Sequence, residues 1–188
     1  MRAMDRYLQR ARIGKAKPYV KPGDCVLDIG SVDGVLFEAL RGTIRRGFGI
    51  DPVLTKTIET DLYTLIPGHF PESCPKGQTF DVITLLAVLE HIPVEAQKAL
   101  AEACFAYLNP GGRVVVTVPS PRVDVILSVL RAFRVIDGMS LEEHYGFKPE
   151  DTPTIFGAPR FRMFAHKTFQ LGLNNLYVFE KVATGKSV

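Results

Sequence analysis

The chain has 188 residues, of which 46% are hydrophobic and 23% charged, and its formal net charge is +3. This length fits one domain, and the high apolar content with the low net charge excludes a mostly disordered chain. The longest apolar stretch, residues 82–89, is much shorter than the ~20 residues of a bilayer span, and no basic run is dense enough to follow a nucleic-acid backbone.

The N-terminal residues 1–15 are basic and lack the apolar region that a secretory signal requires. The three cysteines, Cys25, Cys74 and Cys104, form no close pair and no metal-ligand spacing. Two of them fall in apolar runs, where buried free thiols are common. We therefore expect a reducing, cytoplasmic location and no metal site.

Short apolar runs alternate with helical spacing along the first half of the chain. Residues 25–29 read as a buried strand after a turn, and residues 35–41 have helical spacing. The second and third strands are predicted at residues 48–51 and 57–60. Residues 80–86 are mostly apolar, as in a strand that is buried on both faces.

A helix is predicted from Pro93 to Leu108, because proline suits the first helical turn and residues 109–112 (Asn-Pro-Gly-Gly) end the helix. A fifth strand follows at residues 113–118. Strands and helices that alternate this regularly imply right-handed crossovers and a parallel sheet. The sequence therefore predicts a three-layer α/β sandwich.

The last third of the chain departs from this alternation. Residues 123–136 read as a helix with a wide apolar face, which suits a core helix, a lid over a substrate pocket or a homodimer contact. A short helical stretch is predicted at residues 149–156. Residues 161–169 and 176–182 flank a glycine turn and predict an antiparallel hairpin.

The turn after the first strand has the spacing Gly30-x-x-x-Gly34. It does not match the dinucleotide pattern, because Val32 occupies one of the glycine positions, and it lacks the lysine of a phosphate-binding loop. Asp28 and Asp33 flank the turn and would repel a pyrophosphate. A ligand that carries positive charge would be attracted instead.

S-adenosylmethionine has an ammonium and a sulfonium but no phosphate, and here the sequence resembles the class I S-adenosylmethionine-dependent methyltransferases of the type 11/12-like group. The resemblance rests on four ordered stretches, residues 27–34, 47–52, 80–93 and 108–119. It implies a Rossmann-like, mostly parallel seven-stranded sheet with an antiparallel C-terminal strand at residues 176–182. The length and the lack of a long linker predict one domain over residues 1–188, in which a substrate lid insertion at residues 121–158 is one interpretation.

The resemblance further implies contacts with the cofactor. Asp51 would accept the ribose hydroxyls, about 20 residues beyond the turn, unless it serves only as a turn former. Asp61 would meet the adenine amino group and Leu62 the ring, although a solvated loop acid is the alternative for Asp61. Asp28 would orient the turn or the amino group of the cofactor. The full set of expected cofactor contacts is Asp28, Gly30, Ser31, Gly34, Asp51, Pro52, Asp61, Leu62, Leu86, Ala87 and Val88.

Candidate catalytic residues lie in two segments. His91 follows the fourth strand and suits a general base, although a structural hydrogen bond is its alternative role. His144 and Tyr145 lie in residues 142–146 (Glu-Glu-His-Tyr-Gly), which is similar to a substrate-side segment of related methyltransferases and reads otherwise as a solvated loop.

The resemblance predicts an S-adenosylmethionine-dependent methyltransferase that moves a methyl group to a small-molecule acceptor by in-line displacement. The alternative is a non-catalytic regulatory or scaffold protein that binds S-adenosylmethionine. Its motivation is Val32, which replaces the middle glycine of the family's turn and disfavours a positive φ. Neither nucleic acid nor a membrane is an expected partner, whereas a homodimer is.

Overall fold

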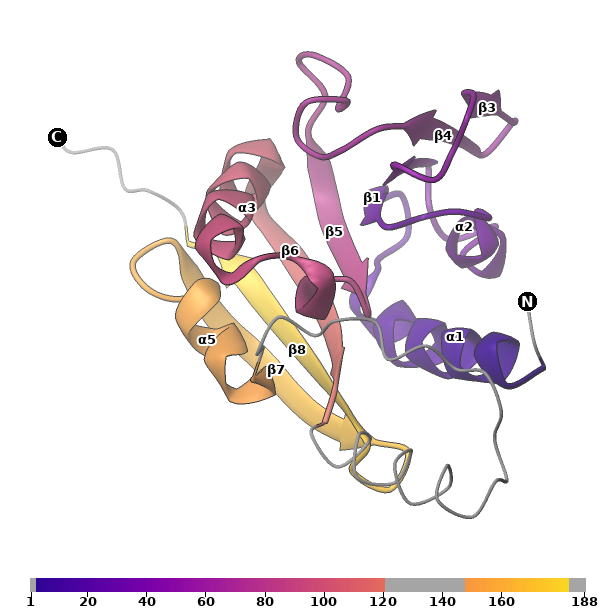
Figure 1. Cartoon of the computed structure of the whole chain (residues 1–188). Coiled ribbons are helices and arrows are strands. Elements are labelled where there is room, and N and C mark those ends of the chain that lie inside the picture. Colours follow the sequence, from indigo (N-terminus) through magenta and orange to yellow (C-terminus); the bar gives the residue numbers. More distant parts are fainter. Residues whose placement is uncertain (1–2, 121–147, 183–188) are drawn as a thin grey trace, which may run out of the picture.

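The computed structural model describes residues 3–120 and 148–182, which form a sheet with helices on both faces (Figure 1). Eight strands of this part pair in the order β3-β4-β2-β1-β5-β6-β8-β7. Their bounds are β1 Cys25–Ile29, β2 Arg46–Asp51, β3 Ile58–Glu59, β4 Tyr63–Pro67, β5 Phe80–Leu86, β6 Leu108–Pro119, β7 Phe161–Phe169 and β8 Asn174–Lys181.

The helices divide between the two faces of the sheet, with α1 and α2 on one face and α3 and α5 on the other (Figure 1). Their bounds are α1 Ala3–Ala16, α2 Val35–Ala39, α3 Val94–Tyr107 and α5 Thr152–Ile155. Three 3₁₀ turns also occur among the described residues, η1 Lys17–Tyr19, η2 Leu89–His91 and η3 Pro149–Asp151. The predicted three-layer sandwich is confirmed.

Alternating side chains of β1 separate two apolar cores. Val26 packs with Ile13 of α1 and Phe37 of α2, whereas Leu27 packs with Leu100 of α3. Successive strand residues point to opposite faces, so a fully buried β1 needs helices on both sides. This explains why the strand is apolar at every position except Asp28.

The order of the strands reverses at β1. The chain leaves β1 for β2 on one side and later returns to β5 on the other side, and both neighbours are parallel to β1. In such sheets, ligands bind beyond the carboxyl ends of the strands at this reversal. The segments that follow β1 and β5 therefore lie at the expected position for a site.

The strand predicted at residues 57–60 is present as β3, but it is not part of the parallel sheet, and the described residues form eight strands where seven were predicted. That run forms only β3, whose two exposed residues pair antiparallel with β4, and β4 is the parallel neighbour of β2. Thr60 turns the chain back, because its hydroxyl donates to the Tyr63 carbonyl and accepts the Tyr63 N–H at 2.9 Å. Leu65 of β4 is buried, and its burial fixes this strand in the sheet.

Several other predicted elements are confirmed. The antiparallel C-terminal strand is β8, which pairs with β6 and, in the hairpin, with β7. The short helical stretch at residues 149–156 is η3 followed by α5. Helix α1 was not anticipated. The predicted helix at residues 123–136 lies outside the described residues, and of the expected lid insertion only residues 148–158 are described.

The helices among the described residues are too short or too polar to cross a membrane. The longest of them, α1 and α3, have 14 residues each.

Candidate functional site

The first part of the site is the turn after β1, where Gly30 meets the segment after β5. Gly30 has a φ of +83°, and its N–H donates to the Ile50 carbonyl at 2.9 Å. A Cβ at Gly30 would lie 2.5 Å from Cγ2 of Val88. Glycine is therefore required for both backbone conformation and space, and the structure brings two of the expected cofactor residues together.

Val32 does not strain this turn. Its backbone φ is not positive, and its side chain is 48% exposed. The valine that departs from the family's glycine thus points outward without forcing a left-handed conformation. Val32 was the reason to consider a non-catalytic protein, and its unstrained, exposed position weakens that reason.

Gly34 has a different role from Gly30. It begins α2 with a φ of +66°, and a Cβ at this position would lie 2.7 Å from the ring of Tyr63. Packing against that ring accounts for the glycine, so its expected contact with a cofactor stays a prediction.

A buried carboxyl group lies directly before the turn. Asp28 Oδ1 accepts a hydrogen bond from the Thr84 hydroxyl at 2.5 Å, and Ser31 also donates to Asp28. Burial raises the pKa of Asp28 to about 7, although these two hydrogen bonds oppose the shift and the charges of Asp33 and Asp51 add to it. A cationic ligand group beside Asp28 would favour its ionised form.

Helix α1 covers the turn and closes a cavity of about 60 Å³ above it. Gln9 Nε2 donates to both carboxylate oxygens of Asp33, at 3.0 and 3.2 Å, and Asp33 also accepts the N–H of Val35 at the start of α2. The cavity is lined by Gln9, Arg12, Ile13, Asp28, Ile29, Gly30, Ser31, Asp33, Leu36 and Leu86.

Arg12 brings a positive charge to the same cavity as Asp28. Its Nε is buried and has no hydrogen-bond partner in the part of the chain that the structure describes. Burial lowers the pKa of Arg12, and the negative charge of Glu90 opposes that shift. Because a buried guanidinium N–H without a partner is costly, an anionic ligand group fits here.

Gln9 and Arg12 are not among the site residues predicted from the sequence. Arg12 and Ile13 follow Gln9 by three and four residues, a spacing that brings both beside Gln9 on the helix, and Ile13 is buried in the core. That spacing was the available signal. Residues 1–15 are predicted only to lack a secretory signal, and no helix is predicted there.

The structure places Asp51 at the carboxyl end of β2, beside the turn. Its side chain is 6% exposed, and its Oδ1 accepts the N–H of Val53 at 2.7 Å. Asp51 therefore forms the turn that continues through Pro52, which is the alternative role predicted for it. The carboxylate still lies at the edge where a ligand would bind, so the ribose contact stays a prediction for Asp51 and Pro52.

Asp61 and Leu62 follow β3, as predicted, but because β3 is antiparallel they precede the parallel strand β4 and lie at the opposite end of the sheet from Asp51. In the parallel pair, Tyr63 aligns with Gly47, which precedes Asp51 along β2. Asp61 is exposed and pairs with Arg41 at 2.8 Å, and this hydrogen bond lowers the pKa of Asp61.

Leu62 is buried in the core on the α1 side of the sheet. The loop after β4, with Gly68 and His69, takes the predicted place of these two residues at the carboxyl edge of the sheet, which is the end at which the parallel strands finish. The Gly68 N–H donates to the Asp51 carbonyl at 3.2 Å.

The segment after β5 turns sharply at Ala87. This residue has a φ of +61°, and its N–H donates to the Thr117 carbonyl at 2.9 Å. Residues other than glycine that are held in this conformation cost about 1–3 kcal/mol and cluster at functional sites. Leu86 lines the cavity and Val88 contacts the turn, so all three expected residues lie at the site.

His91 is the last residue of η2, which follows this turn. Its N–H donates to the Val88 carbonyl at 3.0 Å, and the neighbouring Glu90 is 2% exposed. His91 thus lies close along the chain to the residues that contact Gly30, and its catalytic role stays a prediction. The other two candidates, His144 and Tyr145, lie outside the described residues.

Within residues 3–120 and 148–182, no three His, Cys, Asp or Glu side chains gather closely enough to hold a metal ion. Cys25, Cys74 and Cys104 are buried free thiols. Burial raises the pKa of Cys74 to about 11, so this thiol stays protonated near neutral pH.

The reversed strand order and the glycine turn define a Rossmann-like α/β protein whose site lies at the carboxyl edge of the sheet. Residues 2–152 match the model of the methyltransferase domain family. The chain therefore belongs to that family, as the resemblance predicted.

Curated relatives include ubiquinone biosynthesis O-methyltransferases. That of Nitrosococcus oceani is 27% identical over 147 residues, which cover 70% of this chain and 61% of the relative. That of Paraburkholderia phytofirmans is 34% identical over 101 residues, which cover 49% of this chain and 43% of the relative. The chain thus spans between about two fifths and three fifths of the length of these relatives.

Solved structures share the fold. The N-methyltransferase NodS from Bradyrhizobium japonicum aligns with a TM-score of 0.66 at 15% identity, over 95% of this chain and 98% of NodS. The magnesium protoporphyrin IX methyltransferase from Synechocystis, solved with bound S-adenosylhomocysteine, aligns with a TM-score of 0.63 at 16% identity, over 94% of this chain and 82% of that one.

Proposed function

We propose that this chain catalyses methyl transfer from S-adenosylmethionine to a small-molecule acceptor. The observation that carries the proposal is the cavity above the glycine turn, which Asp28 and Arg12 both line at the strand reversal. Opposite charges on one small cavity suit the zwitterionic amino acid end of this cofactor. Family membership and the S-adenosylhomocysteine bound to a structural neighbour support the same choice.

Each part of the carboxyl edge has a role in this proposal. Asp28 holds the ammonium and Arg12 the carboxylate of the amino acid end. Gly30 allows close approach of the backbone, as do the neighbouring Ser31 and Leu86. Asp51 accepts the ribose hydroxyls, and the loop that begins at Gly68 supports the adenine in place of Asp61.

When bound, the cofactor supplies a methyl group that its sulfonium has already activated. The protein therefore has to align the acceptor with the methyl carbon and exclude water. The turn at Ala87 and the η2 segment form the side of the site where an acceptor would lie. For a hydroxyl acceptor, His91 would take its proton, with His144 and Tyr145 as further candidates.

Titration calorimetry tests the cofactor assignment directly. Purified protein is titrated with S-adenosylmethionine and S-adenosylhomocysteine, with NAD as the control. We expect binding of the first two and none of NAD, because Asp28 and Asp33 would repel a pyrophosphate. Absence of binding by both sulfur compounds would contradict the proposal.

Turnover then separates an enzyme from a binding protein. Hydroxyl-bearing aromatic compounds are the first acceptors to screen, because several relatives are O-methyltransferases. With an acceptor in hand, His91→Asn should lower kcat by ~10²–10⁴-fold if His91 is the base, and cofactor affinity should not change. Unchanged kcat would remove His91 from this role, whereas binding without turnover of any acceptor would favour the regulatory alternative.

The buried free thiols support a reducing, cytoplasmic location as part of this proposal. Fractionation of cells that produce the protein would check it, and recovery outside the cytoplasm would contradict it.

A further inference from the structure

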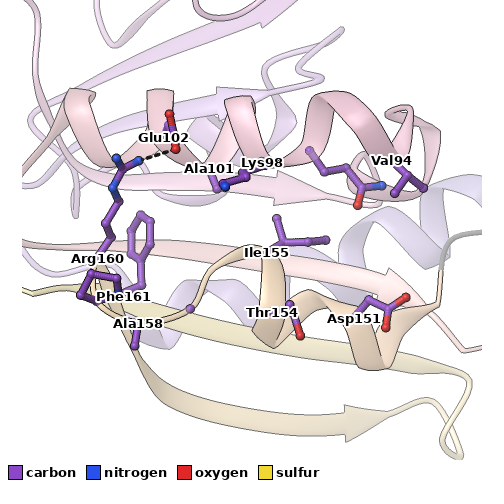
Figure 2. A pocket seen from close by; sticks show the side chains of 13 residues that line it. Val94, Lys98, Ala101, Glu102, Asp151, Thr154, Ile155, Ala158, Arg160 and Phe161 are labelled. Carbon is purple, nitrogen blue, oxygen red and sulfur yellow. Dashed lines mark ion pairs between the residues drawn. The ribbon is translucent and has the colours of Figure 1, made fainter.

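The charged side chains of two cavities differ in burial. The groove between α3 and the segment from α5 to the start of β7 has a volume of about 620 Å³, and its Glu102 and Arg160 pair with each other at 3.0 Å (Figure 2). Its Lys98 and Asp151 are exposed, so water solvates them. Asp28, which lines the cavity above the glycine turn, is only 7% exposed. A carboxyl group that is buried to this degree depends on the protein for its hydrogen bonds.

Asp28 is held from the two strands beside β1. In the sheet it aligns with Gly49 of β2 on one side and with Thr84 of β5 on the other. Gly49 leaves room for the side chain of Ser31, because a Cβ at this glycine would lie 2.8 Å from Cβ of Ser31. Ser31 and Thr84 therefore approach the carboxyl group of Asp28 from opposite sides, and both hydroxyls donate to it.

The Thr84 hydroxyl has two acceptors within reach. Its Oγ1 lies 2.5 Å from Oδ1 of Asp28 and 3.3 Å from the carbonyl oxygen of Leu27, and the Thr84 side chain is fully buried. A hydroxyl carries one proton and can also accept a hydrogen bond. When Asp28 is ionised, Thr84 donates to the carboxylate. When Asp28 is protonated, its proton can point to Thr84, and the proton of Thr84 then points to Leu27.

We propose that Thr84 is a positioning residue of the cofactor site, which holds Asp28 in one orientation in both of its protonation states. The inference rests on the proposed function, in which Asp28 contacts the ammonium of S-adenosylmethionine. Because the carboxyl group is already in place when the ligand arrives, its side chain does not have to be ordered on binding. The hydrogen bond also favours the ionised form of Asp28, which is the form that attracts a cation.

The charged groups around Asp28 do not supply this hydrogen bond. Asp33 in the turn and Asp51 at the end of β2 are acids, and their charges disfavour the ionised form of Asp28, as does burial. Arg12 of α1 lines the same cavity, but its buried Nε has no hydrogen-bond partner among the described residues. The hydroxyls of Thr84 and Ser31 are therefore the groups that offset the cost of ionising Asp28.

The first test needs no cofactor. Carbon-13 NMR of the aspartate carboxyl groups in the free protein measures the pH at which Asp28 is half ionised, and the Asp28 signal is identified by its absence in Asp28→Asn. Thr84→Val removes the hydroxyl and keeps the shape of the side chain. We expect it to raise this midpoint by about one to two pH units, because a hydrogen bond to a charged group is lost. Thr84→Ser keeps the donor and should restore the wild-type midpoint.

Thr152→Val is the matched control for Thr84→Val. It removes an equally buried hydroxyl, whose oxygen has no hydrogen-bond partner in the part of the chain that the structure describes. Thr152 begins α5, on the other face of the sheet (Figure 1). This variant should leave both the midpoint of Asp28 and the binding of ligands unchanged.

Calorimetry then measures the effect on ligands. At pH 8, Thr84→Val should weaken S-adenosylhomocysteine binding by about 10-fold, because less of Asp28 is ionised and its orientation is less fixed. Binding of 5′-methylthioadenosine, which lacks the amino acid end, should not change. A merely structural role of Thr84 would weaken binding of both ligands equally and leave the NMR midpoint where it is.

Equal midpoints in the wild type and Thr84→Val would overturn the inference, as would equal losses of affinity for the two ligands. A raised midpoint in Thr84→Val, together with a wild type that binds no S-adenosylhomocysteine, would instead contradict the proposed function and leave the hold of Thr84 on Asp28 intact. Thermal unfolding shows whether each variant folds. If Thr84→Val does not, Thr84→Cys takes its place, because a thiol is a weak donor, and the midpoint should again rise.

Discussion

Asp51 and Asp61 were both expected to contact the cofactor, yet they lie at opposite edges of the sheet. Asp51 is buried at the carboxyl end of β2 beside the turn that carries Gly30. Asp61 is exposed at the amino end of β4 and paired with Arg41. The two carboxylates differ in position rather than chemistry, and only Asp51 lies at the end of the sheet where ligands bind in folds of this kind.

The largest expected effect comes from breaking the carboxyl edge itself. In Gly30→Ala, the added methyl group meets Val88 at 2.5 Å, on a residue whose φ is +83°. Overpacking and left-handed strain together should cost about 2–4 kcal/mol of unfolding free energy. Calorimetry should detect no cofactor binding by this variant, and adding Val88→Ala should recover part of it.

Gly23→Ala is the matched control for this prediction. Gly23 has the same φ of +83° but precedes β1, and nothing lies within 4 Å of a Cβ there. Its substitution should cost only the backbone strain and leave cofactor affinity unchanged. Equal loss of binding in both variants would mean that the turn has no special role.

The buried Asp28 gives the carboxyl edge a dependence on pH. Because its pKa is raised from 3.8 to about 7, the folded state keeps a proton that the unfolded chain releases. Stability should therefore fall as the pH rises from about 4 to about 7 and then level off, by up to ~4 kcal/mol. Denaturant unfolding at pH 5 and pH 8 checks this dependence.

Asp28→Asn should lose this particular pH dependence, because the amide does not ionise. Cofactor affinity of the wild type should rise over the same pH range, since the carboxylate then faces the ammonium. A wild type and an Asp28→Asn variant with the same pH profile of stability would contradict the assignment.

The comparison of the two aspartates is tested most directly by removing each charge. Asp51→Asn should weaken S-adenosylhomocysteine binding by about 10–100-fold, as expected for a lost hydrogen bond to a charged group. Asp61→Asn should leave the dissociation constant unchanged, because the residue lies at the other edge. Calorimetry of both variants measures the two dissociation constants. Equal effects would contradict the inference that only Asp51 lies at the ligand-binding end of the sheet.

The amino-acid pattern was sufficient for the carboxyl edge at β1, where a fully apolar strand precedes a glycine turn, but not for β3 and β4. Residues 57–60 and Tyr63–Pro67 both contain residues that favour strands, and no glycine marks the tight turn between them. The reversal is stabilised by the Thr60 side chain, which hydrogen-bonds to the backbone of Tyr63. A local pattern could not show which of the two runs becomes the parallel strand.

Helix α1 shows a second limit of prediction from the sequence. Its role depends on contacts with a turn far along the chain, from Gln9 to Asp33 and from Arg12 toward the cavity of Asp28. Periodicity can place Gln9, Arg12 and Ile13 on one face, but it cannot show what that face covers. Tertiary packing therefore decided which polar side chains became part of the candidate site.

The smallest expected effect is that of Gln9→Ala, and it tests whether α1 contributes by covering the glycine turn or by binding the ligand. Gln9→Ala removes two hydrogen bonds to Asp33, and both groups are partly exposed, so unfolding should become easier by only about 1 kcal/mol. Because Asp33 still accepts the N–H of Val35, the turn keeps its shape, and cofactor affinity should fall no more than a few-fold. Arg12→Met should weaken binding more strongly than Gln9→Ala, since it removes the cation from the cavity. If Gln9→Ala lowered cofactor affinity more than Arg12→Met does, α1 would contribute to the site mainly through its hydrogen bonds to the turn and not through the charge of Arg12.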